Sequence, residues 1–362
     1  MKQRILYITR LLLVLLASLA VSCADEDGTE EPLPMPVDEP TLRLEMASDT
    51  RGEGDDDDVQ DVLSVHIYVT TTDTGSKEYT EGDFFKMDQG WSSTASVKTG
   101  VDYYIYGFAP ADICVGEISH LTGETTYENG AKLTLTDMNP VSGSDVGIVT
   151  GVKQVASLAE AATVGAADIP TGNFDYEGQD DGENFVCLKL THLYAAVSIQ
   201  AQVSDAYYDL RKIKVRKMEL QSDYNKPTAV VTLLKDTETG VGSIEWSGLT
   251  SGSGSTTKVV IFDSDDTNES SEDDPLMLDT TAKYISTGYI VGGQTVTLIT
   301  YYDILDKSDN TVRSNCTAAN KLNFTSLGYG QKKPVTLLVD PSYLYQLSEP
   351  DAEIPNIKVV TP

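Results

Sequence analysis

The chain has 362 residues, enough for two domains or for one large domain with a tail at about 100–200 residues per domain. Its 26 Lys and Arg stand against 56 Asp and Glu, a formal net charge of −30 that excludes a nucleic-acid partner, because phosphate binding needs clustered basic residues. A hydrophobic content of 40% suffices for a sizeable core and excludes wholesale disorder. The 19 Tyr, against 7 Phe and 2 Trp, favour pleated strands that are partly exposed to water.

Residues 1–22 form a predicted lipoprotein signal peptide. Basic residues precede the apolar run 11–20, which is too short to span a bilayer as a mature helix. Small residues then lead to Cys23, which resembles the lipobox cysteine of bacterial lipoproteins, although Ala20 stands where that motif usually has Leu. We therefore expect Cys23 to be acylated and to become the mature N-terminus. The alternative is an ordinary signal peptide in which Cys23 is incidental.

Residues 23–40 are acidic and rich in Pro, so they are expected to form an extended tether. Acidic residues directly behind a lipidated cysteine resemble the export signal that sends some Gram-negative lipoproteins to the outer face of the outer membrane. The sequence thus predicts a cell-surface protein that is held to the outer membrane through a lipid on Cys23.

The mature chain then reads as a series of β-strands in which apolar and polar residues alternate. The first, 41–46, has Leu42, Leu44 and Met46 on one face, and a loop rich in Gly and Asp follows it at 48–58. The chain has one predicted helix, at 154–162, and a Gly- and Asp-rich boundary at 172–183. Further predicted strands are 62–69, 101–109, 132–136, 185–190, 195–203, 213–220, 228–234, 258–263, 284–290, 295–303 and 334–339.

Strands of this length, separated by turn-rich stretches, predict an all-β protein rather than an α/β sheet. We expect two β-sandwich domains with little helix. The N-terminal domain is predicted at 41–184 and the C-terminal domain at 185–362.

Residues that could carry catalysis are sparse. The sequence has no G-x-S-x-G elbow, no phosphate-binding loop and no H-E-x-x-H helix, and its three histidines, His66, His120 and His192, have no nucleophile at a recognisable spacing. The sequence therefore predicts that the protein is not an enzyme and has no metal site and no cofactor.

The three cysteines beyond Cys23 are Cys114, Cys187 and Cys316, which are widely spaced and odd in number. This pattern is atypical of a disulfide framework or a C-x-x-C metal site. At most one bridge could form among them, and buried thiols are the favoured interpretation.

In the order and spacing of several motifs, nearly all of the mature sequence resembles the type V fimbrillins, pilins of anaerobic Gram-negative bacteria. The resemblance lies in Cys23 with its acidic tether, the strand 42–46, the Arg51-Gly52 loop leading into 62–69, and the segments 103–109, 192–197 and 341–345. No single one of these motifs is decisive.

The resemblance implies two β-sandwich domains of transthyretin-like type and assembly by strand exchange. A surface protease specific for Arg would cut between Arg51 and Gly52, and the strand carrying Leu42, Leu44 and Met46 would leave. Its hydrophobic groove would then accept a strand from a neighbouring subunit, because main-chain hydrogen bonds hold such a strand and its alternate side chains fill pockets. The implied partners are other fimbrial subunits, the protease and a host or bacterial surface receptor, and the implied role is adhesion within a fimbria.

Two questions stay open in the sequence. Only residues 356–360 near the C-terminus are strand-like, which favours a tip or minor subunit over a shaft subunit, and an anchor fits less well with Arg51. The alternatives to a fimbrial subunit are a monomeric surface lipoprotein that stacks glycans on Trp91, Trp246 or exposed Tyr, and a secreted hydrolase on a β-sandwich.

Overall fold

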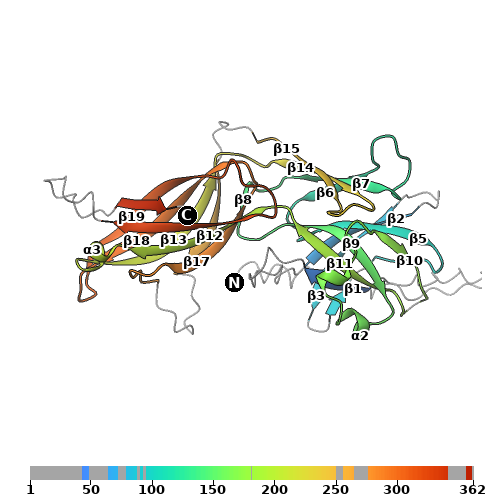
Figure 1. Ribbon diagram of the computed structural model, residues 1–362, viewed down its shortest axis with the longest axis horizontal. Helices are drawn as coiled ribbons and strands as arrows, with labels where there is room; N and C mark the ends of the chain where they lie inside the picture. Colours follow the sequence, from blue (N-terminus) through green and yellow to red (C-terminus); the bar gives the residue numbers. More distant parts are fainter. Residues whose placement is uncertain are drawn as a thin grey trace, which may run out of the picture. The chain divides into compact units, whose positions relative to one another are not determined.

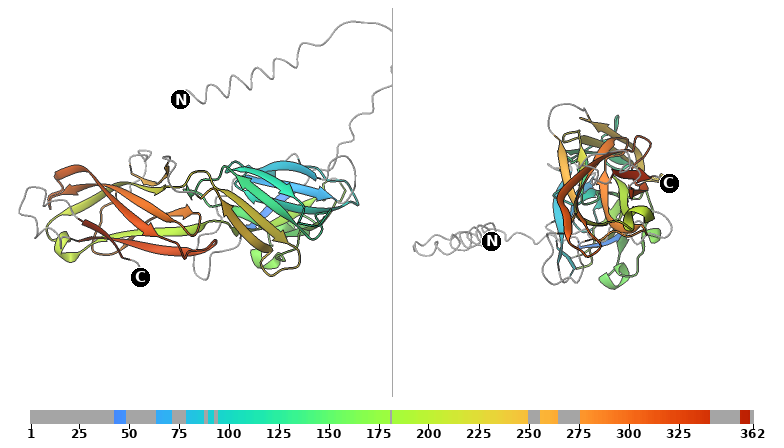
Figure 2. Two further views of the ribbon diagram at one scale, coloured as in Figure 1. Left: turned by 90° about the horizontal axis from the view of Figure 1, so that it is seen from above. Right: turned by 90° about the vertical axis from the view of Figure 1, so that its left-hand side faces the viewer.

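The computed structural model describes residues 43–48, 64–71, 79–87, 90–92, 95–180, 182–249, 256–264, 276–340 and 356–360 (Figures 1 and 2). For 43–48, 86–87, 90–92, 340 and 356–360 it describes the backbone alone. Strands dominate this part of the chain, so the predicted all-β fold class is confirmed.

The largest sheet has eight strands, seven of them in the order β1-β11-β9-β5-β2-β3-β4, with β10 paired to β5 outside this order. Every pairing in it is antiparallel except that of β1 with β11, which is parallel. The strands are β1 (Arg43–Ser48), β2 (Ser64–Thr71), β3 (Tyr79–Met87), β4 (Gly90–Ser92), β5 (Asp102–Ala109), β9 (Gly147–Val155), β10 (Asp175–Glu177) and β11 (Phe185–His192).

This sheet buries both of its faces. On one face, Tyr68 of β2 and Tyr106 of β5 pack against a four-stranded sheet of order β15-β14-β7-β6. On the other face, Ile67 and Ile105 belong to a second cluster. Neighbouring residues of one strand therefore enter different cores, which explains the nearly unbroken apolar runs of the sequence here. The strands of the smaller sheet are β6 (Val115–Ser119), β7 (Gly130–Thr136), β14 (Thr228–Leu234) and β15 (Val241–Ser247).

A second sandwich is made of a five-stranded and a four-stranded sheet. Their orders are β21-β20-β12-β17-β8 and β16-β13-β18-β19, and one core cluster, which includes Val197, Met218 and Val335, lies between them. The strands are β8 (Val141–Ser142), β12 (Ala195–Val203), β13 (Lys212–Ser222), β16 (Thr257–Asp263), β17 (Lys283–Ile290), β18 (Thr295–Leu305), β19 (Thr311–Asn323), β20 (Lys332–Asp340) and β21 (Asn356–Val360).

Strands from both predicted domain ranges share three of the four sheets. β11 pairs with β9, β14 pairs with β7, and β8 pairs with β17. The division into 41–184 and 185–362 stays a prediction about domains, but the sheets themselves draw on both sides of residue 184.

The predicted helix at 154–162 is wrong in extent. Its first residues belong to β9, whose β-branched residues pair between β5 and β11. Helix begins only after Ser157, whose hydroxyl accepts the Glu160 N–H, and α2 (Leu158–Ala161) is a single turn. The other helical segments among the described residues are η1 (Ala166–Asp168) and α3 (Asp205–Tyr208).

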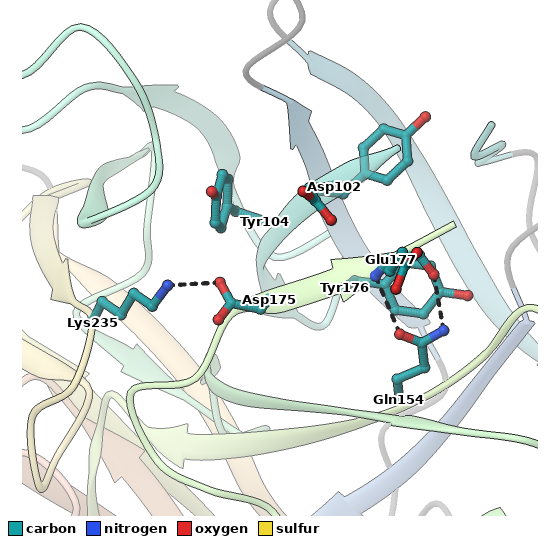
Figure 3. A pocket seen from close by; sticks show the side chains of 8 residues that line it. Asp102, Tyr104, Gln154, Asp175, Tyr176, Glu177 and Lys235 are labelled. Carbon is teal, nitrogen blue, oxygen red and sulfur yellow. Dashed lines mark hydrogen bonds and ion pairs between the residues drawn. The ribbon is translucent and has the colours of Figure 1, made fainter. Parts of the chain in front are cut away.

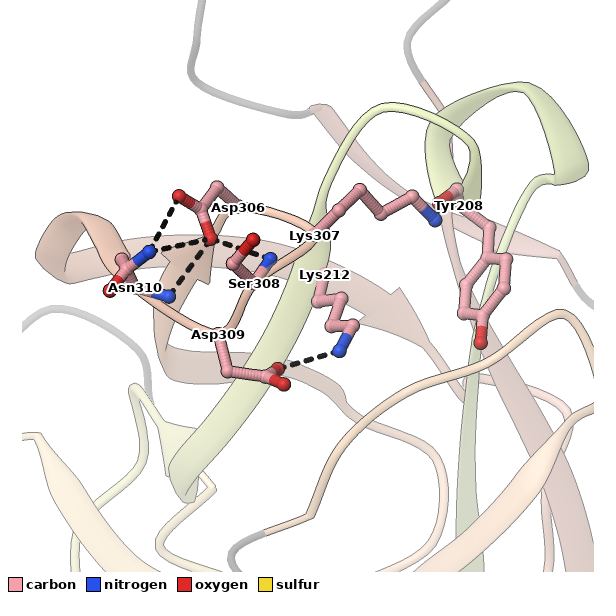
Figure 4. Close-up of polar contacts among 7 residues, drawn as sticks. All are labelled: Tyr208, Lys212, Asp306, Lys307, Ser308, Asp309 and Asn310. Carbon is pink, nitrogen blue, oxygen red and sulfur yellow. Dashed lines mark hydrogen bonds and ion pairs between the residues drawn. The ribbon is translucent and has the colours of Figure 1, made fainter.

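The turn between β18 and β19 is built from side-chain hydrogen bonds (Figure 4). The Asp306 carboxylate accepts the backbone N–H groups of Ser308 and Asn310. Asp309 has a φ of 65° and accepts a hydrogen bond of 2.7 Å from Lys212 of β13. These contacts reverse the chain and align β19 with β18.

Candidate functional site

The first strand, β1, lies at the edge of the eight-stranded sheet. Its pairing with β11 sets Leu44 beside Val186 and Met46 beside Leu188. β1 also contacts β4, the strand at the opposite end of the same sheet. The sheet is therefore curled, and β1 lies at the seam between its two ends.

The inside of this curl is apolar. The cluster there contains Val186, Leu188 and Leu190 of β11, each with no exposed surface, together with Phe84 of β3 and Val152 of β9. Residues paired in register lie on the same face of a sheet, so Leu44 and Met46 belong to the face that carries this cluster. We call the space between β11 and β4 over this cluster the β1 slot.

The opposite face of β11 is covered by α2. Phe185 and Cys187 pack there with Val155, Ala161 and Ile169. The Glu160 carboxylate accepts the N–H of Ala156 and so closes the turn that positions α2. Both faces of β11, the strand that borders the slot, are thus covered by packed side chains.

Several predicted site residues lie outside the described part of the chain. These are the lipidation residue Cys23, the cleavage residues Arg51 and Gly52, and Leu42 of the removable strand. Leu44 and Met46 are described through their backbone, and both lie in β1, which begins and ends two residues later than the predicted strand.

The last strand, β21, also lies at a sheet edge. It pairs antiparallel with β20, placing Val359 beside Leu337, and it contacts β19 of the facing sheet. The C-terminal strand expected from the sequence is therefore present, and it is paired within its own chain.

Two of the three histidines, His66 and His192, have acidic neighbours. His66 Nδ1 lies 2.5 Å from an Asp83 carboxylate oxygen, and His192 contacts Asp145, with both of these side chains buried. The pair of His192 and Asp145 was not found from the sequence, because the two residues are 47 positions apart. Within the described residues no group of His, Cys, Asp or Glu is arranged to hold a metal ion, and no helix is long and apolar enough to cross a membrane.

No disulfide joins Cys114, Cys187 and Cys316. Burial raises the pKa of the Cys114 thiol to about 12. Trp246 is partly buried and packs against the core: its ring stacks on Tyr194 at 6.2 Å between centroids. Part of the Trp246 ring is thus used in packing against Tyr194, and the side chain of Trp91 lies outside the described part.

No protein-family model matches the chain, and no curated protein sequence is detectably similar to it. Among solved structures, a fimbrial protein from Bacteroides vulgatus is 13% identical, with a TM-score of 0.38 over 89% of this chain and 98% of that one. A proposed cell adhesion protein from Bacteroides fragilis is 10% identical, with a TM-score of 0.39 over 89% and 97%. The fimbrial anchor protein Mfa2 from Porphyromonas gingivalis is 9% identical, with a TM-score of 0.31 over 88% and 96%.

These structural neighbours are fimbrial and adhesion proteins of Bacteroidales, the class of proteins that the sequence resembles. At such identities and TM-scores, the function of this chain has to be argued from its own residues and strand order.

Proposed function

We propose that the chain is a structural subunit of a type V fimbria that polymerises by strand exchange at the β1 slot. The observation that carries this proposal is the position of β1. Among the described residues it is an edge strand that forms a ladder with β11 alone, and it is separated from β2 by residues 49–63. Its removal would break one ladder and leave the order of the other strands of that sheet intact.

Loss of β1 would be costly unless another strand replaced it. The outer N–H and C=O groups of β11 would lose their partners, and the cluster that contains Val186 and Leu188 would be uncovered. Leu42, Leu44 and Met46 would each forfeit about 1.5–3 kcal/mol of burial if fully buried in the slot. A strand with apolar residues at alternate positions from a neighbouring subunit would restore both kinds of contact.

In this proposal the precursor is exported as a lipoprotein acylated at Cys23 and displayed on the outer membrane. A surface protease cuts between Arg51 and Gly52, which lie in the Gly- and Asp-rich segment behind β1. Cleavage frees the subunit from its lipid and makes β1 separable. The mature subunit is then part of a surface fimbria and serves adhesion.

A tip or minor position suits this chain better than a shaft position. A shaft subunit has to donate a strand as well as accept one. The strand-like residues at the C-terminus are those of β21, and β21 pairs with β20 of the same chain. The main alternatives are a fimbrial anchor, which would keep its lipid and escape cleavage, and a monomeric glycan-binding lipoprotein.

The experiment that tests the proposal is to determine the N-terminal residue of the protein in surface material sheared from cells. We expect Gly52. An acylated Cys23 found only in the membrane fraction, with none of the protein in sheared filaments, would contradict the proposal and favour the anchor or the glycan-binding lipoprotein.

A further inference from the structure

Basic residues gather at the start of β13. Five of the chain's 26 Lys and Arg fall within residues 211–217, although the formal net charge of the chain is −30. Ile213 and Val215 of this stretch belong to the core cluster of the second sandwich. Lys212 and Lys214 occupy the alternate positions, so they lie on the opposite face of the sheet.

A cavity of about 470 Å³ opens beside these two lysines. We call it the β13 pocket. Leu278 and Leu305, which are 3% and 7% exposed, give it an apolar wall, and Lys212, Lys214 and Lys283 line it with ammonium groups. Small-ligand sites are cavities of about 300–1,000 Å³ that combine apolar walls with a few charged groups. The β13 pocket has both properties.

Lys214 carries the positive charge that the fold leaves uncompensated. Lys212 lies 2.7 Å from an Asp309 carboxylate oxygen, and Lys283 lies 2.9 Å from one of Asp279. The side chain of Lys214 is half-buried, and it makes no hydrogen bond or ion pair with any described residue. Three lysines and two aspartates give the lining of the pocket a net charge of +1. The group that matches this lining is an anion.

A phenol ring also lines the β13 pocket. It belongs to Tyr208 of α3, which is 36% exposed. Lys307 fixes this residue: its Nζ lies 4.3 Å from the centre of the ring and donates to the Tyr208 carbonyl (Figure 4). The ring is therefore held in place before a ligand arrives, which lowers the entropic cost of binding against it.

A cavity in the first sandwich shows that a positive lining is specific to the β13 pocket (Figure 3). That cavity, of about 370 Å³, is lined by Asp102, Asp175 and Glu177 together with Lys235, whose ammonium is bonded to Asp175 at 2.9 Å. Its three acidic residues are all exposed, so water solvates their charge. The excess charge in the β13 pocket has the opposite sign, in a chain with 56 acidic and 26 basic residues.

We propose that the β13 pocket binds an anionic sugar residue of a glycan, one whose ring carries a carboxylate or a sulfate group. The Lys214 ammonium donates to the anion, and the Tyr208 ring and the two leucines contact the apolar side of the sugar ring. The Asp279 and Asp309 carboxylates, which only accept hydrogen bonds, accept from sugar hydroxyls. Acidic peptide side chains fit less well, because carboxylates bring no donor for these two aspartates.

This inference goes beyond strand exchange and does not depend on it. Every residue that lines the β13 pocket lies between Tyr208 and Asp309, in the second sandwich, whereas the β1 slot belongs to the first. The uncut precursor and a cleaved subunit would both carry the pocket. A failure to bind sugars would therefore leave the proposal for the β1 slot unaffected.

The test is a calorimetric or NMR titration of the purified, uncut chain with trigalacturonic acid and with galactose 6-sulfate. The ligand controls are the neutral methyl ester of trigalacturonic acid and Nα-acetyl-triglutamyl amide, a peptide with the same number of carboxylates. We expect at least one anionic sugar to bind, both controls to bind at least about tenfold more weakly, and added salt to weaken the binding. The comparison of the two anionic sugars identifies the preferred anion. Binding of neither sugar, or binding of a control as tight as that of the sugars, would overturn the proposal.

A lysine variant tests the role of the uncompensated charge. Lys214→Gln should weaken binding of the anionic sugar about tenfold or more, because a charge-assisted hydrogen bond is lost, and it should leave the melting temperature unchanged because no ion pair is broken. Lys321→Gln, at an exposed position of β19, is the matched control and should change neither property. Equal binding by both variants would mean that only the overall charge of the chain matters.

A tyrosine variant separates a built site from simple attraction between charges. Tyr208→Ala keeps every charge in the pocket but removes the ring, and it should weaken binding of the anionic sugar at least about threefold. Tyr329→Ala is the matched control, because Tyr329 is 44% exposed and is not among the residues that line the pocket. Unchanged binding by Tyr208→Ala would overturn the assignment of a sugar ring to this pocket.

Discussion

Met46 of β1 is paired with Leu188 of β11, a residue with no exposed surface that comes 142 positions later in the sequence. The pairing is parallel, whereas the other pairings of that sheet are antiparallel. An edge strand is held in a sheet by one ladder of main-chain hydrogen bonds and by the packing of its side chains. β1 is such a strand, and it runs parallel to its partner. The contributions of side-chain packing and of main-chain pairing to the stability of β1 can therefore be measured separately by mutation.

Met46→Ala should destabilise the uncut chain by about 2 kcal/mol, because its register places Met46 on the face of the sheet that carries the buried Leu188. Urea unfolding measures the change. Glu45→Ala is the matched control, since Glu45 is the neighbouring residue and is paired with Cys187 on the other face. Equal losses in both variants would show that β1 contributes by its backbone alone.

Arg51→Ala should give a folded subunit that does not polymerise. The chain would keep β1 in its slot because the segment behind it is uncut. Electron microscopy of the cell surface and N-terminal sequencing check this. Arg43→Lys is the control: Arg43 lies within β1, and its replacement should leave cleavage at Arg51 unchanged. Filaments of normal length from Arg51→Ala would contradict the proposal that cleavage after Arg51 is needed for polymerisation.

Release of β1 should make Cys187 reactive. Cys187 is 1% exposed in β11, next to the strand that leaves, whereas Cys316 lies in the core of the second sandwich. Thiol labelling followed by mass spectrometry should show faster modification of Cys187 after Arg cleavage and an unchanged rate at Cys316, where burial raises the pKa of the thiol. Unchanged labelling of Cys187 would mean either that the strand stays in place after cleavage or that the packing of Cys187 under α2 suffices to protect the thiol.

The sequence predicts strands well where both faces of a strand are buried. The run at 101–109 corresponds to β5, because a strand between two cores needs apolar residues at successive positions. The run at 195–203 matches β12, whose first five residues are all buried. The sequence analysis misses β19, whose first five residues are all exposed and, apart from Val312, polar. That strand forms because it pairs with β18 after the Asp306 turn, and its sequence carries no alternation to reveal it.

The partners of the edge strands could not be predicted. The alternation at 41–46 identifies a strand, but its partner β11 lies about 140 residues away in the sequence and is placed in the sheet by its pairing with β9. The same holds for Asp102 and Glu177, which become neighbours only through the register of β5 with β10. Such relationships are set by the pairing of distant strands, and the local alternation of apolar and polar residues does not predict which strands pair.

Glu219 of β13 provides a pH-dependent test of the second sandwich. Its carboxylate is 2.9 Å from Lys217 Nζ and accepts a hydrogen bond of 3.0 Å from the Tyr301 hydroxyl. Burial raises the pKa of this carboxyl, but the hydrogen bonds from Lys217 and Tyr301 outweigh it and hold the pKa below its ordinary value. A depressed pKa in the folded state stabilises the protein above the unfolded-state pKa, about 4.3 for Glu, and this stabilisation is lost as the pH falls through the folded-state pKa.

Glu219→Gln should therefore cost about 1 kcal/mol at pH 7, with a difference from the parent chain that shrinks progressively as the pH drops below about 4. Urea unfolding at several pH values measures both effects. Glu238→Gln, at an exposed turn position, is the control and should stay close to the parent throughout. A cost that is the same at acid and neutral pH would assign the role of Glu219 to packing, because only the ionised carboxylate attracts Lys217.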